Sequence, residues 1–327
     1  MLKVIHAGMM TAVQDGGRNG YRNLGISQGG VLDLPAMKMA NLLVGNGADA
    51  AVLEITLGQF SAEVTAAGWL ALTGADCHAQ LDGKPLWTGW RFQVRPGQSL
   101  KLGTPKHGMR SYLAVSGGFD VPMVLNSRST DLKAEFGGHQ GRMIRDGDLL
   151  AAGKPRFLPT RQMGIRQLLF GNRVRALPGP EYREFSADSQ EAFWRSSWQL
   201  SPQSNRMGYR LQGRTLTRTT ERELFSHGLL PGVVQVPHGG QPIVLMADAQ
   251  TTGGYPRIAC VIAADLFHLA QIRLGEPIHF IQCTLEEAHG AWLEQQRYLE
   301  QIAWQLELAR QPVLPTKPRA RTRGKVN

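Results

Sequence analysis

Residues 235–258, QVPHGGQPIVLMADAQTTGGYPRI, indicate the fold class of this chain more clearly than any other stretch. Within them, residues 243–246 (IVLM) have the length and β-branched content of a buried strand. A loop follows at once, and its Gly-Gly pair lets the backbone approach a ligand closely. The loop carries a carboxylate, an amide, hydroxyls, a phenol and a guanidinium: Asp248, Gln250, Thr251, Thr252, Tyr255 and Arg257. Such groups at the mouth of a strand are typical of binding sites, although a solvated hairpin turn explains them equally well.

Strand signals of this kind dominate the chain. The clearest are short apolar runs at residues 53–64, 70–81, 92–102 and 111–115. Turn pairs such as Asp82-Gly83 separate them, and the 38 glycines and 18 prolines agree with many strands and tight turns. The sequence therefore predicts a mainly β fold.

The strand-rich character covers two halves, residues 1–155 and 165–284, and the proline-bearing residues 156–164 form the predicted linker. A short fragment recurs between the halves, RNGYR at residues 18–22 and RMGYR at residues 206–210, which hints at related halves.

Few helices interrupt the strands. One is predicted between an Asp33 cap, with Pro35 in its first turn, and Gly45, and another at residues 189–195.

A longer helix is predicted at residues 285–310, where Thr284 and Glu287 make a capping box. Apolar residues at steps of three and four leave one stripe on it: Leu285, Ala288, Trp292, Leu299, Ile302, Leu306 and Ala309. Packing of this stripe on its own domain is the simplest interpretation, and a partner or a second copy of the chain is the alternative.

Composition excludes several classes of protein. At 327 residues, with 42% hydrophobic and 19% charged residues, the chain is long and apolar enough for folded cores. No apolar run reaches membrane-spanning length, and the N-terminus lacks the apolar region of a signal peptide, so we expect no membrane association. Three distant cysteines without metal spacing, and scattered histidines, predict reduced thiols, a cytoplasmic location and no metal site.

The net charge of +10 is concentrated at one end. Residues 311–327 carry five basic side chains and no acid, and their prolines predict a disordered basic tail. Because no aromatic residues are interleaved with these charges, we expect no nucleic-acid partner.

Three apparent motifs fail in their context. Residues 36–39 (AMKM) spell the surroundings of a biotinylated lysine, but they fall inside the predicted helix, so we expect no biotin on Lys38. Residues 25–29 (GISQG) match a nucleophile elbow without the strand before it. Residues 147–154 resemble a phosphate loop that is one residue too long, and Pro155 replaces the required Ser or Thr.

Polar clusters remain as site candidates. They place charged or amide groups beside glycines or hydroxyls, at residues 11–18 (TAVQDGGR), 127–130 (SRST), 137–142 (GGHQGR) and the 248–257 loop. This chemistry suits recognition of a small polar molecule, although each cluster alone could be a solvated turn. From residue chemistry alone, the prediction is a two-part β-rich protein with a polar cleft.

Several sequence blocks, in order, resemble one family. They lie at residues 11–15, 20–21, 40–46, 53–54, 112–118, 127–130, 137–142, 179–181, 206–208, 235–237 and 250–256. Together they identify the chain as similar to the biotin-dependent carboxyltransferase family (allophanate hydrolase subunit 2, KipA-like), which includes the C subunit of 5-oxoprolinase. The resemblance runs from about residue 2 to 282, and it departs from the family pattern only at Asn126 and Leu274.

The resemblance implies two cyclophilin-like β-barrel domains and a role within an ATP-dependent 5-oxoprolinase complex, which opens 5-oxoproline to L-glutamate. The implied partners are a KipI-like B subunit and a LamB/YcsF-like A subunit, with a small amide substrate. ATP would act in the complex, bound by or shared with a partner. Two alternatives stay open: a KipA-like antagonist of a KipI-like kinase inhibitor, and a carboxyltransferase acting on a urea-like amide.

Residue chemistry then suggests roles within this frame. Asp248, as proton acceptor or N–H anchor, Arg128 and Tyr255 are the catalytic candidates. The substrate-binding candidates are polar or glycine residues of the same clusters: Gln14, Asp15, Gln235, Thr251, Thr252, Gly253, Gly254 and Arg257. Arg128 and Arg257 would hold a carboxylate or phosphate, and the amides and hydroxyls would orient the ring amide.

Overall fold

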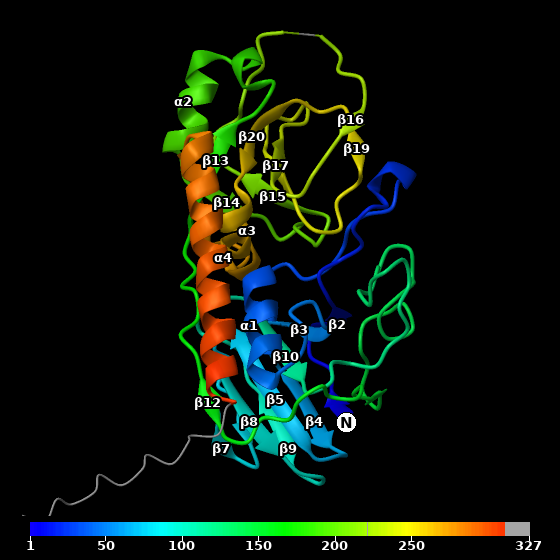
Figure 1. The fold of residues 1–327 in the computed structure, drawn as a ribbon. Coiled ribbons are helices and arrows are strands. Elements are labelled where there is room, and N and C mark those ends of the chain that lie inside the picture. Colours follow the sequence, from blue (N-terminus) through cyan, green and yellow to red (C-terminus); the bar gives the residue numbers. More distant parts are fainter. Residues whose placement is uncertain (221, 311–327) are drawn as a thin grey trace, which may run out of the picture.

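A computed structural model describes residues 1–220 and 222–310. Two β-rich units lie one above the other, and a long C-terminal helix runs along both (Figure 1). The prediction of a mainly β fold with few helices and a C-terminal helix is confirmed. The predicted basic tail, residues 311–327, lies outside the described residues.

The N-terminal unit is built from two six-stranded sheets. The first contains, in spatial order, β11 (Leu149–Leu150), β1 (Leu2–His6), β4 (Phe60–Val64), β9 (Ser99–Leu102), β6 (Gln80–Leu81) and β7 (Lys84–Pro85). The second contains β12 (Met163–Gly164), β8 (Trp90–Val94), β5 (Gly68–Gly74), β10 (Arg110–Val115), β3 (Val52–Thr56) and β2 (Met10–Gln14). An apolar core joins the two sheets, with contributions from β1 and β4 on one side and β3, β5 and β10 on the other.

Helix α1 (Leu34–Val44) covers the other face of the second sheet (Figure 1). Alternation along β10 shows the consequence, because Leu113 faces the sheet–sheet core while Tyr112 faces α1. The Asp33 carboxylate accepts a hydrogen bond from the Ala36 N–H (2.9 Å), and Gly45 ends the helix with φ 78°. The predicted helix is therefore confirmed.

The C-terminal unit is a closed seven-stranded barrel. Its order is β13 (Arg173–Pro178), β20 (Arg257–Val261), β17 (Val233–Gln235), β18 (Ile243–Leu245), β15 (Gly208–Gln212), β14 (Trp198–Leu200) and β21 (Pro277–Gln282). Parallel pairing of β13 with β21 closes it, and β16 (His227–Gly228) and β19 (Thr252–Gly253) form a separate two-stranded antiparallel sheet. The strand predicted at residues 243–246 is thus β18, inside the barrel wall.

Short helices complete this unit. Helix α2 (Ala187–Arg195) begins two residues before the predicted start, because Ser186 caps it by accepting from the Ser189 N–H. The remaining elements are α3 (Leu266–Gln271) and the 3₁₀ turns η2 (Tyr182–Glu184) and η3 (Ala263–Asp265), with η1 (Arg22–Leu24) in the N-terminal unit.

The predicted linker, residues 156–164, is tied to the N-terminal unit at its end. There β12 pairs with β8 through Met163 opposite Arg91, so the second sheet extends to Gly164.

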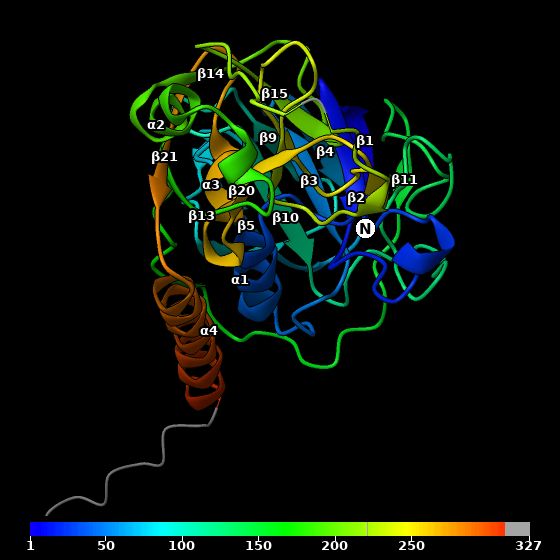
Figure 2. The same ribbon diagram turned by 90° about the horizontal axis from the view of Figure 1, so that it is seen from above.

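Helix α4 (Leu285–Leu308) has the predicted capping box and runs beside α1 (Figures 1 and 2). Its first turns pack on the C-terminal unit through Ala288 and Ala291. Its last turns bury Leu299, Ile302 and Leu306 against α1 of the other unit. The expected packing of the stripe on its own domain therefore holds for the first turns of α4 but not for the last ones, and α4 clamps the two units together.

Candidate functional site

Three of the predicted polar clusters, at residues 11–18, 127–130 and 137–142, come together around Arg18, which lies near Asp248 where the two units join. The Thr130 N–H donates to the Val13 carbonyl (3.0 Å), which places residues 127–131 beside the end of β2. The segment after β2 then crosses to the barrel, where the Gly29 N–H donates to the Ala247 carbonyl (3.0 Å) next to Asp248. We call this group the Arg18 centre, defined by Gln14, Asp15, Arg18, Ser129, Asp131 and Asp248.

Arg18 is the distinctive member of this centre, because it is fully buried and only partly satisfied. One guanidinium nitrogen, Nη2, donates to the Ser129 carbonyl, and the guanidinium lies 4.5 Å from the centroid of the Phe136 ring. Nε and Nη1 are buried without a hydrogen-bond partner among the described residues. Buried donors are nearly always paired, so two unpaired ones in a single side chain make Arg18 a candidate for ligand contact.

Charge balance around Arg18 supports a cation at this position. Burial lowers the pKa of Arg18, while the nearby carboxylates of Asp131, Asp15 and Asp248 act in the opposite direction. A third unsatisfied atom lies close in sequence, since Gln14 donates through Nε2 to the Thr130 carbonyl (3.2 Å) while its buried Oε1 has no partner in the described chain.

Asp15 organises the loop around Arg18. Its carboxylate accepts hydrogen bonds from Ser127 Oγ (2.6 Å), Ser129 Oγ (2.6 Å) and the Gly17 N–H (2.9 Å). It also accepts from the Arg128 N–H. A carboxylate with four donors already in place holds a loop better than it holds a substrate.

Asp248 belongs to a buried ion network across the two units. Arg206 donates to both of its oxygens, from Nε (2.8 Å) and Nη2 (2.9 Å). The same guanidinium donates from Nη1 to Glu54 on β3 of the other unit, and from Nη2 to the Gly30 carbonyl. Burial opposes the charge, yet the carboxylates of Asp248 and Glu54 raise the pKa of Arg206 well above its ordinary value.

Gly29 lies between the free donor of Arg18 and the carboxylate of Asp248. A Cβ atom added there would lie 3.4 Å from Arg18 Nη1 and 3.8 Å from Asp248 Oδ1. Gly137 permits a similarly close approach on the other side, since a Cβ there would be 2.2 Å from the Ser129 carbonyl oxygen. The free donor of Arg18 and a carboxylate oxygen of Asp248 therefore both lie near the position that a side chain at residue 29 would occupy.

Sequence reasoning missed Glu54 and Arg206 as site residues, and it gave Arg18 no role of its own within the predicted cluster at residues 11–18. The signal was present, because residues 18 and 206 open the recurring fragments RNGYR and RMGYR. Both arginines prove to be buried beside Asp248.

The other residues predicted from the 235–258 segment lie elsewhere. Tyr255 and Gly254 line a cavity of about 720 Å³ on the barrel with Arg218 and His238. Gln235 donates from Nε2 to the Tyr255 carbonyl (3.3 Å), within the barrel wall.

Arg257 and the Gly-Gly pair also have internal roles. The Arg257 guanidinium donates to both oxygens of Glu181 (2.7 Å each). Thr251, Thr252 and Gly253 belong to the two-stranded β16–β19 sheet and its edge, where the Thr251 carbonyl accepts from the Leu229 N–H. A Cβ on Gly254 would lie 2.7 Å from the Leu224 carbonyl oxygen, so this glycine admits a neighbouring loop.

Arg128 stands apart from the Arg18 centre in its side chain, although its N–H donates to Asp15. Its Nε donates to the Val121 carbonyl (3.0 Å), and the side chain lines a different cavity with Lys154 and Arg156.

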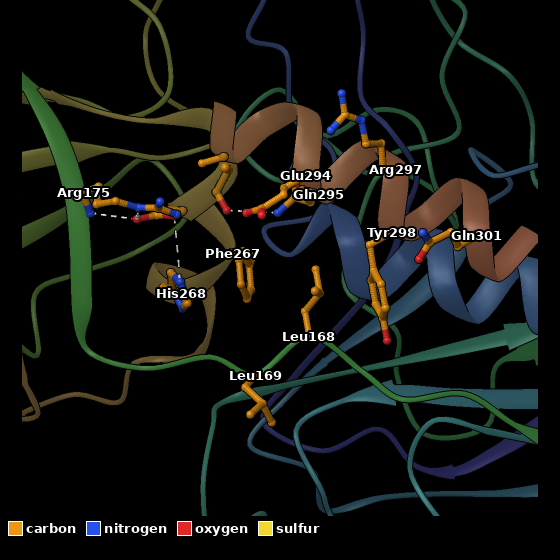
Figure 3. A pocket seen from close by; sticks show the side chains of 13 residues that line it. Leu168, Leu169, Arg175, Phe267, His268, Glu294, Gln295, Arg297, Tyr298 and Gln301 are labelled. Atoms are coloured by element: carbon orange, nitrogen blue, oxygen red, sulfur yellow. Dashed lines mark hydrogen bonds and ion pairs between the residues drawn. The ribbon is translucent and has the colours of Figure 1, made fainter. Parts of the chain in front are cut away.

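A further cavity of about 490 Å³ lies between α3, α4 and residues 168–169 (Figure 3). Its strongest charges are matched internally, because Arg175 donates to both oxygens of Asp265 (2.9 and 2.7 Å). Burial lowers the pKa of His268 beside this pair. These contacts support the junction of α4 with the barrel more than they suggest a ligand.

Across residues 1–220 and 222–310, no group of three or more His, Cys, Asp or Glu residues is placed to hold a metal ion. None of the helices in this part of the chain has both the length and the apolar content that crossing a bilayer requires.

Comparison with known proteins places this geometry in a family. The model of the carboxyltransferase domain, subdomain A and B, matches residues 24–282. The chain belongs to this carboxyltransferase domain family.

Relatives of the domain are similar over nearly the whole chain. The C subunit of 5-oxoprolinase from Escherichia coli (strain K12) is 66% identical over 306 residues, 94% of this chain and 99% of that protein. The protein of the same name from Haemophilus influenzae is 44% identical, over 92% of this chain and 97% of its own length. The crystal structure of Kluyveromyces lactis urea carboxylase superposes with a TM-score of 0.85 at 26% identity, over 92% of this chain and 29% of that one.

The matched carboxyltransferase region contains Glu54, Arg206 and Asp248, but Arg18 and α4 fall outside it. The two E. coli and H. influenzae relatives extend beyond this region on this chain, because they cover more than nine tenths of it.

Proposed function

We propose that this chain is the C subunit of a 5-oxoprolinase, which opens 5-oxoproline to L-glutamate with hydrolysis of ATP. The observation that carries the proposal is the 66% identity to the E. coli protein of that name, over nearly the full length of both chains. Identity at this level over nearly the full length of both chains makes a common role the simplest explanation.

The Arg18 centre provides a chemically suitable place for a ring amide. The free Nε and Nη1 donors of Arg18 would bind the carbonyl oxygen and stabilise negative charge that develops there when the amide bond breaks. Asp248 would accept a hydrogen bond from the ring N–H. Because Arg206 already donates to both Asp248 oxygens, anchoring the N–H is better supported than removing its proton.

The ATP chemistry is assigned to the complex. The phosphate-loop-like residues 147–154 form a turn and strand β11 instead of the strand, loop and helix that cradle a nucleotide. We therefore propose that ATP is bound by, or shared with, a KipI-like B subunit and a LamB/YcsF-like A subunit. The free thiols Cys77, Cys260 and Cys283 suit a complex in the cytoplasm.

One structural observation favours a second candidate. The similarity to urea carboxylase, with a TM-score of 0.85, supports carboxyl transfer to a urea-like amide. This chain spans only 29% of that enzyme, so such a reaction would need further domains from other chains.

The test is ATP-dependent release of glutamate from 5-oxoproline by the reconstituted complex, with and without this chain. We expect release only when all three kinds of chain are present. Release that is independent of this chain would remove the enzymatic role, and carboxybiotin-dependent transfer to urea would favour the second candidate.

A further inference from the structure

A cavity of about 360 Å³ lies behind the Asp15 loop, separate from the Arg18 centre. The turn that follows α1 forms one wall, at residues 46–50. Gly117, Arg128, Lys154 and Arg156 complete the lining.

The backbone around this cavity is closely packed. The Gly153 N–H donates to the Gly118 carbonyl (2.9 Å), and a Cβ on Gly117 would lie 2.0 Å from the Gly153 carbonyl oxygen. With φ of 93°, Gly117 adopts a backbone conformation that side chains disfavour. The stretch that carries Lys154 is thereby held beside the turn that follows β10.

The cavity has an excess of positive charge. Arg128, Lys154 and Arg156 make no ion pair with any residue that the structure describes, and Asp49 is the one acid in the lining. The Arg128 side chain is fixed by its Nε, which donates to Val121, and its terminal nitrogens make no hydrogen bond within residues 1–220 and 222–310. A half-buried, oriented guanidinium with two free donors suits bidentate binding of a phosphate, and Lys154 adds a point charge.

This cavity and the Arg18 centre share one segment of chain, residues 128–129, which contributes to both. The Arg128 N–H donates to Asp15, and the next residue, Ser129, donates from Oγ to Asp15 and accepts from Arg18 through its carbonyl. On the cavity side, a Cβ on Gly16 would lie 3.1 Å from Asp49 Oδ1. An anion bound by Arg128 would therefore lie one residue along the chain from the contact that holds Arg18.

We propose that the Arg128–Lys154–Arg156 cavity binds a phosphate group, either inorganic phosphate or the phosphate chain of a nucleotide. Residues 147–154 do resemble a phosphate loop in sequence, and the structure assigns Lys154 to a phosphate site of another kind, built on side chains instead of a helix N-terminus. Binding itself does not depend on the proposed function. Only the use of the phosphate beside an amide rests on it.

The test is titration of the full chain with inorganic phosphate and, in a second arm, with ATP, followed by calorimetry at constant ionic strength. The variants Lys154→Gln and Arg156→Gln remove exposed charges and should not disturb folding. Each is expected to weaken binding on the order of tenfold, because each removes a charge-assisted contact. Arg95→Gln removes an exposed arginine outside the cavity and serves as the matched control.

Weakening in both cavity variants but not in Arg95→Gln supports the site. Tighter binding of ATP than of inorganic phosphate would identify a nucleotide as the source of the phosphate. Equal affinities for the two would favour the free ion. Two results would overturn the proposal. One is unchanged affinity for phosphate in the cavity variants, and the other is a binding signal with sodium chloride equal to that with phosphate. Because the titration does not measure turnover, its failure is distinguishable from a failure of 5-oxoproline hydrolysis in the reconstituted complex.

Discussion

Replacing Arg206 with methionine should destabilise the protein severely. Arg206 donates to Asp248 twice, to Glu54 once and to the Gly30 carbonyl, and all four contacts are lost in Arg206→Met. Glu54 keeps hydrogen bonds from the Leu32 N–H and the Tyr112 hydroxyl, but Asp248 loses both of its side-chain donors. Removing one partner of a buried ion pair costs about 3–5 kcal/mol, because the remaining charge stays uncompensated.

Urea unfolding followed by circular dichroism measures this loss. A decrease of about 1–2 M in the unfolding midpoint is expected for Arg206→Met. The matched control is Arg210→Met, four residues along the same segment, where the arginine is exposed and a change within about 0.5 kcal/mol is expected. Adding Asp248→Asn to Arg206→Met should recover part of the stability, since it removes one orphaned charge. Equal midpoints for Arg206→Met and Arg210→Met would refute the account of the interface.

Three further predictions concern the Arg18 centre, the stability of the protein at acid pH and the packing of α4 against α1. Arg18→Lys keeps the charge but not the two aimed donors, so turnover of the reconstituted complex should fall by about 10²–10³-fold while the urea midpoint changes little; unchanged turnover would exclude Arg18 from catalysis. The hydrogen bond from Arg142 lowers the pKa of Asp148 to about 2, so the wild type should exceed Asp148→Asn in stability above about pH 4, and the gap should close as the pH falls through 2; a gap that is constant with pH in urea melts would contradict this. Ile302→Ala should cost about 2–5 kcal/mol in the same melts, because the side chain is 3% exposed between α4 and α1, whereas Leu285→Ala, at an exposed position of the same helix, should cost little; equal costs would show that the clamp does not stabilise the fold.

Local signals were sufficient for the elements themselves. The Asp33 cap and Gly45 bound α1 as predicted, and the Thr284–Glu287 capping box begins α4. These features depend on residues three or four positions apart, so the interactions that produce them can be recognised in the amino-acid sequence. The apolar run at residues 243–246 forms β18, as its length and β-branched content predicted.

The site was only half predictable. The clusters at residues 11–18, 127–130 and 137–142 do come together, around Arg18, and Arg18 lies near Asp248. The 251–257 loop does not join them, because its polar groups are engaged inside the barrel. Arg257 pairs with Glu181, and the glycines admit neighbouring loops. A polar residue beside glycine looks the same in sequence whether its partner is a ligand or another part of the chain.

The strand-rich halves, the capped helices and the family could all be predicted before the structure was known, since each rests on local pattern or on ordered blocks of residues. Tertiary structure alone decided that Arg206 is neutralised by Glu54 and Asp248, and that Arg18 keeps two free donors. These properties depend on residues far apart in the chain, 152 positions for Arg206 and Glu54, being brought within hydrogen-bond distance in a region shielded from water. Ion pairing and burial decide whether a charged side chain stabilises the fold or is free to bind a ligand. Both arise only when the two units pack against each other.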